Sequence, residues 1–433
     1  MIVATGIVLL IVFLIVGAPV GFALGLSGLV GLYLVGGMDA ICGVMNTVPY
    51  RTAASYTLTT VPMFILMAEL IAESGIVKEI FGAAQKWLER LPGGLAIAST
   101  FAAAGMAAMS GSSTASAAAL SSIAVPEMRN HGYSVHVAAG VVTVAGTLAI
   151  MIPPSIQLVL YGIITENSIG KLLIAGVVPG LLTAGMYVVG IVIWSKVNPN
   201  VMPPSSTNYS WRDKWSSILP LWAFILLAVI VLGSIYLGVA TPTEAAAVGA
   251  FGALVIPLVR RQIDIRGIMH AVKRTIKVTT MIFMIIIGAM IFGYFLTLTQ
   301  ATQGLIQLIT DLNVSPSIAF FLLVIMYLVL GCFLDVIAIM LITLPLVYPL
   351  IIALGFNPIW FGVVVVKLIE IALITPPLGM NAYVVSVSTD IPVEDVFKGT
   401  AVMLSFEFIT LTLLIFFPSI ITWLPSMMFV NLQ

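Results

Sequence analysis

The stretch GTLAIMIPPS, from Gly146 to Ser155, places two adjacent prolines inside an otherwise apolar run. Proline has no amide proton and its ring clashes with the carbonyl oxygen of residue i−4, so a helix cannot continue through the pair. A helix that enters from Val135 must therefore end near Ile152, and another can begin near Ser155. A second copy of the pattern, IALITPPLGMN, runs from Ile371 to Asn381. The sequence predicts a broken helix in each copy.

The composition places both breaks inside a membrane. The chain has 433 residues, of which 61% are hydrophobic and 8% charged, and its mean hydropathy is +1.19. Apolar runs of about 17 to 25 residues recur along the chain, and no run alternates as a transmembrane barrel strand would. The formal net charge is zero, which gives no reason to expect a nucleic-acid partner. We therefore predict an all-α polytopic membrane protein.

The N-terminal segment, MIVATGIVLLIVFLIVGAPVG, lacks a basic region before its apolar run, so we interpret it as a retained first helix and not as a signal peptide. Cys42 and Cys332 are too few and too far apart to indicate a disulfide framework or a metal site. The sequence contains no phosphate-binding glycine loop and no nucleophile with a partner base. We expect a protein that is not an enzyme and has no transition metal.

Landmark residues of the first half of the chain recur in the second half. Pro153 and Pro376 lie 223 positions apart, and the same offset relates prolines and glycines elsewhere in the sequence. The matched pairs are Pro19 with Pro242, Pro126 with Pro349, Gly132 with Gly355, Ala149 with Ala372, and Gly176 with Gly399. A constant offset that matches residues at the ends of elements indicates an internal duplication.

The expected organisation is a first repeat over residues 1–195, a linker over 196–214, a second repeat over 215–425 and a tail over 426–433. Each repeat has a helical hairpin, at about 95–125 and 318–352, and a broken helix, at about 135–165 and 359–388. Unpaired backbone at membrane depth is tolerated where it lines a cavity or is buried in protein. Two such breaks in corresponding halves indicate the substrate and ion site of a secondary transporter.

The charge distribution sets how the two copies are oriented. The loop from Arg260 to Lys277 carries six basic residues, so the positive-inside rule places it in the cytoplasm. Two spans separate this loop from the linker, which is therefore expected to be cytoplasmic as well. The segment Lys78 to Arg90 carries three basic residues, whereas its counterpart, Ala301 to Asn313, has no Lys or Arg. We predict two inverted-topology repeats, amphipathic arms on opposite membrane surfaces and both termini in the periplasm.

Each hairpin has polar residues at the depth where it would turn. Ser and Thr surround a glycine in MSGSSTAS, Met109 to Ser116, within an apolar stretch too long for one span and too short for two. This length predicts a re-entrant hairpin with a polar tip, whose oxygen atoms are ligands of the kind that hard cations prefer. Small residues also permit close helix packing in membranes, and that interpretation stays open.

The second hairpin places Asp335 opposite Ser112 under the offset. A carboxylate inside a membrane is costly and indicates a function. It could also cap the helix that starts at Val336, and the two interpretations are compatible.

The breaks themselves offer both signs of partial charge. The carbonyl end of the first half-helix is partially negative and the amide end of the next is partially positive, so a cation and an anion can both be accommodated. Side chains add oxygen atoms at the breaks: Thr147, Ser155, Gln157, Thr375 and Asn381. We expect Lys367 and Glu370, spaced i and i+3, to pair with each other. Glu69, Glu73 and Glu407 are predicted to lie near span ends and receive no role.

The MSGSSTASAAALSSIAVPEM hairpin, the IMIPPS break and the TPPLGMNAYV break resemble the large membrane subunit of tripartite ATP-independent periplasmic (TRAP) transporters. The resemblance covers nearly the whole chain. It implies sodium-driven, elevator-type uptake of a carboxylated solute across a bacterial inner membrane, with sialic acid as the first choice and a C4-dicarboxylate as the next. The implied partners are a small four-helix membrane subunit, expected here as a separate chain, and a periplasmic substrate-binding protein.

On this basis the expected cofactors are none, with sodium ions as coupling ions. The candidate substrate-binding residues are Ser112, Ser155, Gln157, Asp335 and Asn381. The candidate sodium ligands are Ser112, Ser113, Thr114, Thr147, Met151, Pro153, Gly331, Asp335, Thr375, Pro377 and Gly379. Two alternatives remain at this point: a stand-alone sodium/dicarboxylate symporter of similar architecture, and an intramembrane enzyme or scaffold.

Overall fold

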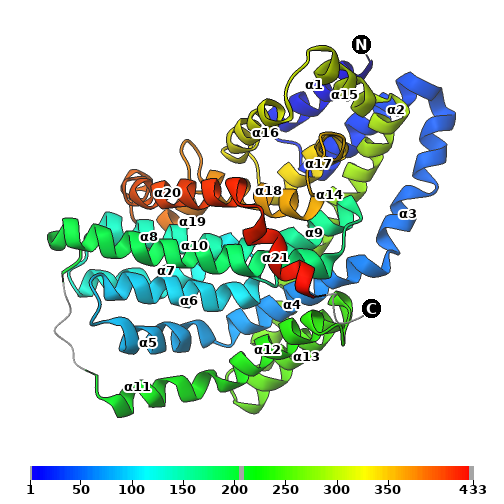
Figure 1. Cartoon of the computed structure of the whole chain (residues 1–433). Coiled ribbons are helices and arrows are strands. Elements are labelled where there is room, and N and C mark those ends of the chain that lie inside the picture. Colours follow the sequence, from blue (N-terminus) through cyan, green and yellow to red (C-terminus); the bar gives the residue numbers. More distant parts are fainter. Residues whose placement is uncertain (1, 204–208, 429–433) are drawn as a thin grey trace.

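The structure is a computed structural model that describes residues 2–203 and 209–428, without the side chains of residues 108–110. Its described part consists of helices joined by short loops, as the sequence predicted, and contains no strand (Figure 1). Within these ranges, nine helical segments are long and apolar enough to cross a membrane. The chain is therefore a multi-pass membrane protein.

The first series of elements comprises α1 (Ile2–Ile15), α2 (Val20–Met45), α3 (Val48–Ala53), η1 (Tyr56–Thr59), α4 (Thr60–Glu73), α5 (Ile76–Leu88), α6 (Gly94–Ser110), α7 (Ser113–Asn130), α8 (Val135–Met151), α9 (Ile156–Thr165) and α10 (Ile169–Val197). The short η2 (Pro199–Val201) and α11 (Trp211–Ile218) follow. The predicted linker falls partly outside the described residues, at 204–208, as does the end of the predicted tail, at 429–433.

The second series comprises η3 (Leu219–Leu221), α12 (Trp222–Tyr236), α13 (Pro242–Val259), α14 (Ile265–Leu298), α15 (Ala301–Asp311), α16 (Pro316–Gly331), α17 (Val336–Ala353), α18 (Pro358–Ala372), α19 (Met380–Thr389), α20 (Val393–Phe416) and α21 (Ser419–Met427). Elements recur at the offset found in the sequence: α7 begins at Ser113 and α17 at Val336, and α8 begins at Val135 and α18 at Pro358. Gly132 and Gly355, which precede α8 and α18, both have left-handed backbone, with φ of +80° and +81°.

The two series pack against each other in matching pairs. Helix α7 packs on α19 and α17 on α9, so each hairpin contacts the broken helix of the other repeat. Similarly, α8 packs on α20 and α18 on α10, while α2 packs on α14 and α4 on α13. In Figure 1, α6, α7 and α8 lie side by side, which agrees with their mutual contacts. Reciprocal contacts of this kind are what a two-fold relation between inverted repeats produces.

Both predicted breaks are present. The first separates α8 from α9 over residues 152–155, and the second separates α18 from α19 over residues 373–379. The Pro153–Pro154 and Pro376–Pro377 peptide bonds are both cis. The second break is longer because Gly379 adopts left-handed backbone, with φ of +51°, and the amide of Asn381 donates to the carbonyl of Leu373 at 3.1 Å.

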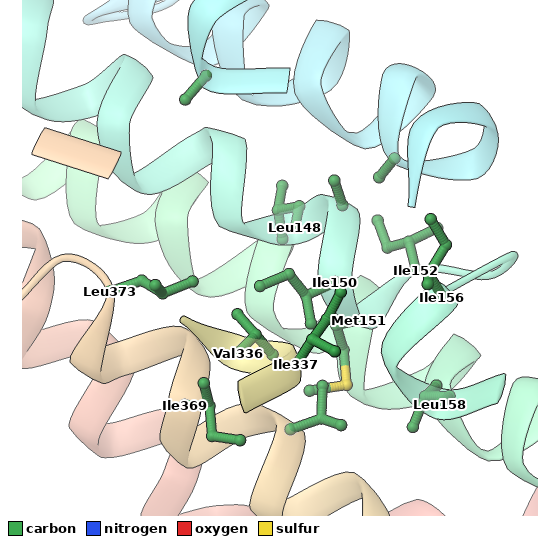
Figure 2. Packing of buried hydrophobic residues seen from close by; sticks show 14 of the residues in the cluster. Leu148, Ile150, Met151, Ile152, Ile156, Leu158, Val336, Ile337, Ile369 and Leu373 are labelled. Carbon is green, nitrogen blue, oxygen red and sulfur yellow. The ribbon is translucent and has the colours of Figure 1, made fainter. Parts of the chain in front are cut away.

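Buried apolar side chains surround the first break and join the repeats. Figure 2 shows Met151 and Ile152 from the first break in one cluster with Val336 at the start of α17 and Ile369 and Leu373 from the second broken helix. All five are almost fully buried. Packing of this density holds the irregular backbone in place, because each buried side chain contacts several others.

The landmark glycines allow helices to approach closely. A Cβ atom on Gly176 would lie 2.6 Å from the carbonyl oxygen of Met151, and one on Gly399 would overlap the carbonyl of His136. Small residues at such contacts let helix backbones meet inside a membrane protein. Gly176 and Gly399 therefore both have to be glycine because a neighbouring helix backbone lies too close for a side chain.

Candidate functional site

Each hairpin tip contacts the break of its own repeat. Gly111 at the first tip has φ of +55°, and a Cβ there would lie 2.9 Å from the carbonyl oxygen of Pro154. At the second tip the thiol of Cys332 lies 3.5 Å from the carbonyl oxygen of Pro376, to which it can donate. Gly331 packs directly on Ala372, where α18 ends.

The first hairpin also contacts the second broken helix through polar side chains. The hydroxyl of Ser113 donates to Oδ1 of Asn381 at 3.4 Å. Asn381 is fully buried, and no described residue accepts a hydrogen bond from its amide nitrogen. The equivalent positions in the other pair of elements are Val336 and Leu158, which are apolar. The two repeats thus share a backbone design but differ in the polarity of this contact.

Helix N-termini from both repeats gather at this place. Three carry a side-chain cap: Ser112 accepts from the amide of Ala115 at 3.4 Å, Ser155 from Leu158 at 3.3 Å, and Asp335 from Ile337 at 3.2 Å. The fourth, α19, follows Gly379 and has no side-chain cap. The N-terminus of a helix carries partial positive charge, so the four helix N-termini together favour an anion in the space between them.

A cavity of about 860 Å³ lies between the two tips and two long helices outside the hairpins. Its polar lining comes from Ser112, Ser113 and Thr114 at the first tip, Asp335 at the second, Gln157 at the start of α9, and Lys277 and Thr280 of α14. Residues 19–22 of α2 and its preceding loop and Met380 of α19 also line the cavity. The volume is suitable for a small organic molecule, and its lining is mostly apolar with a few polar groups.

The cavity brings together three of the five candidate substrate residues: Ser112, Gln157 and Asp335. Ser155 and Asn381 are buried behind it. The hydroxyl of Ser155 donates to the carbonyl of Ile150 and lies 3.3 Å from Oε1 of Gln157, so it supports Gln157.

The candidate sodium ligands fall into three places. Ser112, Ser113, Thr114 and Asp335 line the cavity. A second group lies at the two breaks and the second tip: Met151, Pro153, Gly331, Thr375, Pro377 and Gly379. Thr147 does not line the cavity, because its hydroxyl donates to the carbonyl of Val144 at 2.7 Å and lies 3.1 Å from the hydroxyl of Tyr187.

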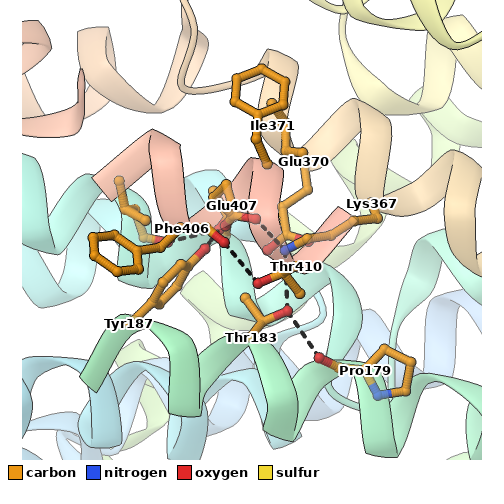
Figure 3. A network of polar contacts seen from close by, with 12 residues as sticks. Pro179, Thr183, Tyr187, Lys367, Glu370, Ile371, Phe406, Glu407 and Thr410 are labelled. Atoms are coloured by element: carbon orange, nitrogen blue, oxygen red, sulfur yellow. Dashed lines mark hydrogen bonds and ion pairs between the residues drawn. The ribbon is translucent and has the colours of Figure 1, made fainter. Parts of the chain in front are cut away.

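The expected ion pair between Lys367 and Glu370 is present, with Nζ 3.3 Å from Oε2. The prediction for Glu407 was wrong. Glu407 is fully buried in the middle of α20 and forms an ion pair with Lys367 (Figure 3). The helix starts at Val393, two turns before the apolar run that begins at Ala401, so Glu407 lies in its middle and not near its end.

Glu69 and Glu73 do lie near the end of α4, where they contact α14. Arg274 is 3.6 Å from Glu69, and His270 is 2.6 Å from Glu73. Sequence reasoning gave no site role to Lys277, which lines the cavity. The expectation of a loop from Arg260 to Lys277 was wrong, because α14 starts at Ile265. Lys277 is the last basic residue of that segment, and the sequence interpretation used its charge only for orientation.

Comparison with known proteins agrees with this architecture. The family model described as "Tripartite ATP-independent periplasmic transporter, DctM component" matches residues 7–420. A C4-dicarboxylate TRAP transporter large permease protein from Pseudomonas aeruginosa is 37% identical over 93% of this chain and 94% of its own. A sialic acid TRAP transporter large permease protein from Vibrio cholerae is 30% identical over 96% of each chain.

A solved structure shares the fold. The YdaH transporter of Alcanivorax borkumensis aligns with a TM-score of 0.63 over 91% of this chain and 89% of its own, at 14% identity. That likeness concerns the arrangement of helices alone. The family model and the relatives extend over nearly the whole sequence, including both hairpins and both breaks. This chain therefore belongs to the large permease family of TRAP transporters, a family of membrane transport subunits that are not enzymes.

Proposed function

We propose that this chain is the transport subunit of a sodium-coupled importer of a carboxylated solute, and that the solute binds in the cavity between the two hairpin tips. The observation that carries the proposal is the lining of this cavity. Helix N-termini, the hydroxyl of Ser112 and the ammonium of Lys277 can all contact a carboxylate. Asp335 and the nearby hydroxyl and carbonyl oxygens can hold sodium ions beside it.

A C4-dicarboxylate is the first candidate solute and sialic acid the second. Two relatives named for C4-dicarboxylates are 37% and 34% identical to this chain, whereas a third relative so named and the relative named for sialic acid are each 30% identical. This order reverses the one expected from the sequence, and it rests on similarity, since no lining residue distinguishes the two solutes.

We infer an elevator mechanism from a difference between the scaffold contacts of the two repeats. We call the helices α2, α4, α13 and α14, which lie outside the hairpins and broken helices, the scaffold. Helices α14 and α4 correspond under the offset, yet α14 packs on α17 of the second hairpin whereas α4 packs on α6 and α9. The hairpins and broken helices therefore sit asymmetrically against a symmetric scaffold, as they would at one end of a sliding movement. Because Lys277 is the last residue of the basic segment expected in the cytoplasm, we assign this position to the inward-facing state.

The family works with a small membrane subunit and a periplasmic binding protein. For this chain we propose a separate small subunit, a binding protein that delivers the solute, a bacterial inner-membrane location and both termini in the periplasm. A stand-alone symporter is the second candidate, because two hairpins and two breaks form a complete cavity within one chain. Co-purification of a small membrane protein with the tagged chain would distinguish the two.

The test is uptake into proteoliposomes that contain the chain and its small subunit, with the binding protein outside. We expect accumulation of a labelled C4-dicarboxylate or sialic acid that requires an inward sodium gradient and the binding protein. Accumulation that is unchanged when choline replaces sodium would overturn the coupling. Accumulation without the binding protein would support the stand-alone symporter.

A further inference from the structure

A polar cluster lies inside the helices, outside the lining of the cavity described above. Lys367 and Glu370 of α18 and Glu407 of α20 are each 0% exposed. The ammonium of Lys367 contacts Oε2 of Glu407, lies 3.3 Å from Oε2 of Glu370 and donates to the hydroxyl of Thr183 on α10 at 3.1 Å. Figure 3 shows the three charged side chains converging between these helices. We call them the buried triad.

The charges of the buried triad do not balance. One ammonium faces two carboxylates, and no other Lys, Arg or His in the described part of the chain pairs with either glutamate. The charged residues on the helices packed around it, such as His136 on α8 and Lys398 on α20, form no ion pair with either glutamate, and the tyrosines there have partners of their own. Tyr187 lies against Thr147, Tyr161 donates to the carbonyl of Pro358, and Tyr327 lies 2.9 Å from Thr343. A net negative charge that is fully buried is costly, so the group takes up a neutralising ion or proton.

The glutamate oxygens also have few donors. Beyond the contacts with Lys367, no described residue donates a hydrogen bond to Glu407, and the only further donor to Glu370 among the described residues is the hydroxyl of Thr147. An ionised carboxylate buried in protein is normally surrounded by donors. A carboxyl group that carries a proton needs fewer of them. The two fully buried side chains with open oxygen atoms therefore indicate that something positive is bound at this place.

The fold does not require these charges. Under the repeat offset, Lys367, Glu370 and Glu407 correspond to Val144, Thr147 and Ala184, all uncharged. The first copy of the same helix pair thus has no charge at the three matched positions, although its backbone packing is equivalent. Buried charges are costly, and only the second repeat has them at these positions. This difference indicates that the triad binds a positive group and is not needed for helix packing.

We propose that the buried triad is a proton-binding site that holds one proton on the Glu370 and Glu407 pair. The proton comes from water and forms one O–H bond with a carboxylate oxygen, which leaves one carboxylate to balance Lys367. The triad is then neutral inside the helices that are proposed to move across the membrane. A proton fits better than a sodium ion because none of the three residues lines the cavity, and a proton needs no space of its own. This inference does not depend on which solute is carried.

Infrared difference spectroscopy of the full chain, purified in detergent, tests the proton directly through the carbonyl stretch of a neutral carboxylic acid, which shifts in D₂O. Either Glu370→Gln or Glu407→Gln leaves one carboxylate against one ammonium, so each variant should lose one acid band. Lys367→Met should gain one, because both glutamates must then be neutral. Glu394→Gln, at the exposed start of α20, is the matched control and should leave the band unchanged.

An acid band that is the same in wild type and both glutamine variants would overturn the proposal. A band that appears in wild type only after sodium is removed would also overturn it, in favour of a sodium ion at the triad. If one glutamine variant fails to fold, the other and Lys367→Met still give opposite expected signs; if Lys367→Met fails to fold, the loss of one band in each glutamine variant still tests the proposal.

Thermal unfolding gives an independent measurement. At neutral pH the folded wild type holds a proton that a glutamate in the unfolded chain has already lost, so its stability should fall as pH rises. Glu370→Gln carries no such proton, and its melting temperature should fall less steeply over the same range. Equal slopes in the two proteins would contradict the proposal.

Discussion

The hydroxyl of Ser113, in the first hairpin, donates to Oδ1 of Asn381, in the second broken helix, across 3.4 Å. This contact joins the two repeats beside the cavity. Its counterpart positions, Val336 and Leu158, hold only apolar side chains, which shows that the fold can be built there without polar groups. The polar pair is therefore a candidate for function, and the partly unsatisfied amide of Asn381 strengthens the case.

Asn381→Leu places in the second repeat the residue that the first repeat uses at the same position. We expect the variant to fold with nearly unchanged thermal stability, because a buried amide with an unmet donor is replaced by an apolar group of similar size. Solute uptake should fall at least tenfold. Asn130→Leu, at the exposed end of α7, is the control. Uptake by Asn381→Leu equal to that of the control would remove Asn381 from the site.

Asp335 has two roles that substitutions can separate. Its carboxylate lines the cavity and also accepts from the amide of Ile337 at 3.2 Å as the cap of α17. Asp335→Ala should abolish transport and lose about 1 kcal/mol of stability with the cap. Asp335→Asn can still cap the helix but carries no charge, so it should keep its stability and lose transport. Transport by Asp335→Asn at the wild-type rate would mean that the residue acts only as a cap.

Lys277 is expected to contact the carboxylate of the solute. Lys277→Gln should raise the KM for uptake about tenfold or more, because a charge-assisted contact is lost, and should change the maximal rate much less. Lys273→Gln is a matched control, since Lys273 is also exposed on α14, one turn away, but does not line the cavity. Equal KM values for the two variants would show that Lys277 does not touch the solute.

Much of this architecture could be predicted from the sequence because proline and glycine act locally. The double prolines predicted both breaks, and a polar segment inside an apolar run predicted both hairpins. The position of Glu407 could not be predicted in this way. Its helix starts at Val393, but the first two turns are polar, so the apolar run that indicates a membrane span begins only at Ala401. Lys277 reaches the cavity only through the packing of α14 against α17, which a single sequence does not reveal.

The topology prediction can be tested on the two arm helices, α5 and α15. The charge pattern places α5 inside and α15 outside. Single cysteines at Arg90 and Gln307, in a background that lacks Cys42 and Cys332, should react with an impermeant thiol reagent from opposite sides. Both positions are exposed, whereas Gln85 is half-buried and donates to Glu127 at 3.1 Å. Reaction from the same side would mean that the repeats are parallel.

Coupling to at least two sodium ions is expected from the duplication, because each repeat supplies a hairpin tip and the carbonyl end of a broken helix. At about 100 mV each inward charge contributes roughly 2.3 kcal/mol, and a tenfold sodium gradient adds about 1.4 kcal/mol per ion. Two ions supply about 7 kcal/mol, and a monoanion costs about 2.3 to import, which leaves roughly 5 kcal/mol for accumulation. One ion leaves only about 1.4 kcal/mol, or tenfold accumulation.

Initial uptake of a monoanionic solute should therefore depend on sodium with a Hill coefficient above one, and an inside-negative potential should stimulate it because net positive charge enters. The potential can be set with potassium and valinomycin. Substitution of either Ser112, at the first tip, or Thr375, at the second break, should lower the apparent sodium affinity, since each belongs to a different repeat. The control is Ser122→Ala, in the same hairpin but exposed and far along α7 from the tip. A hyperbolic sodium dependence without stimulation by the potential would contradict two coupled ions. If only one of the two substitutions lowers the apparent sodium affinity, all the coupling lies in one repeat. The unequal polarity of the Ser113–Asn381 and Val336–Leu158 contacts would then explain this difference between the repeats.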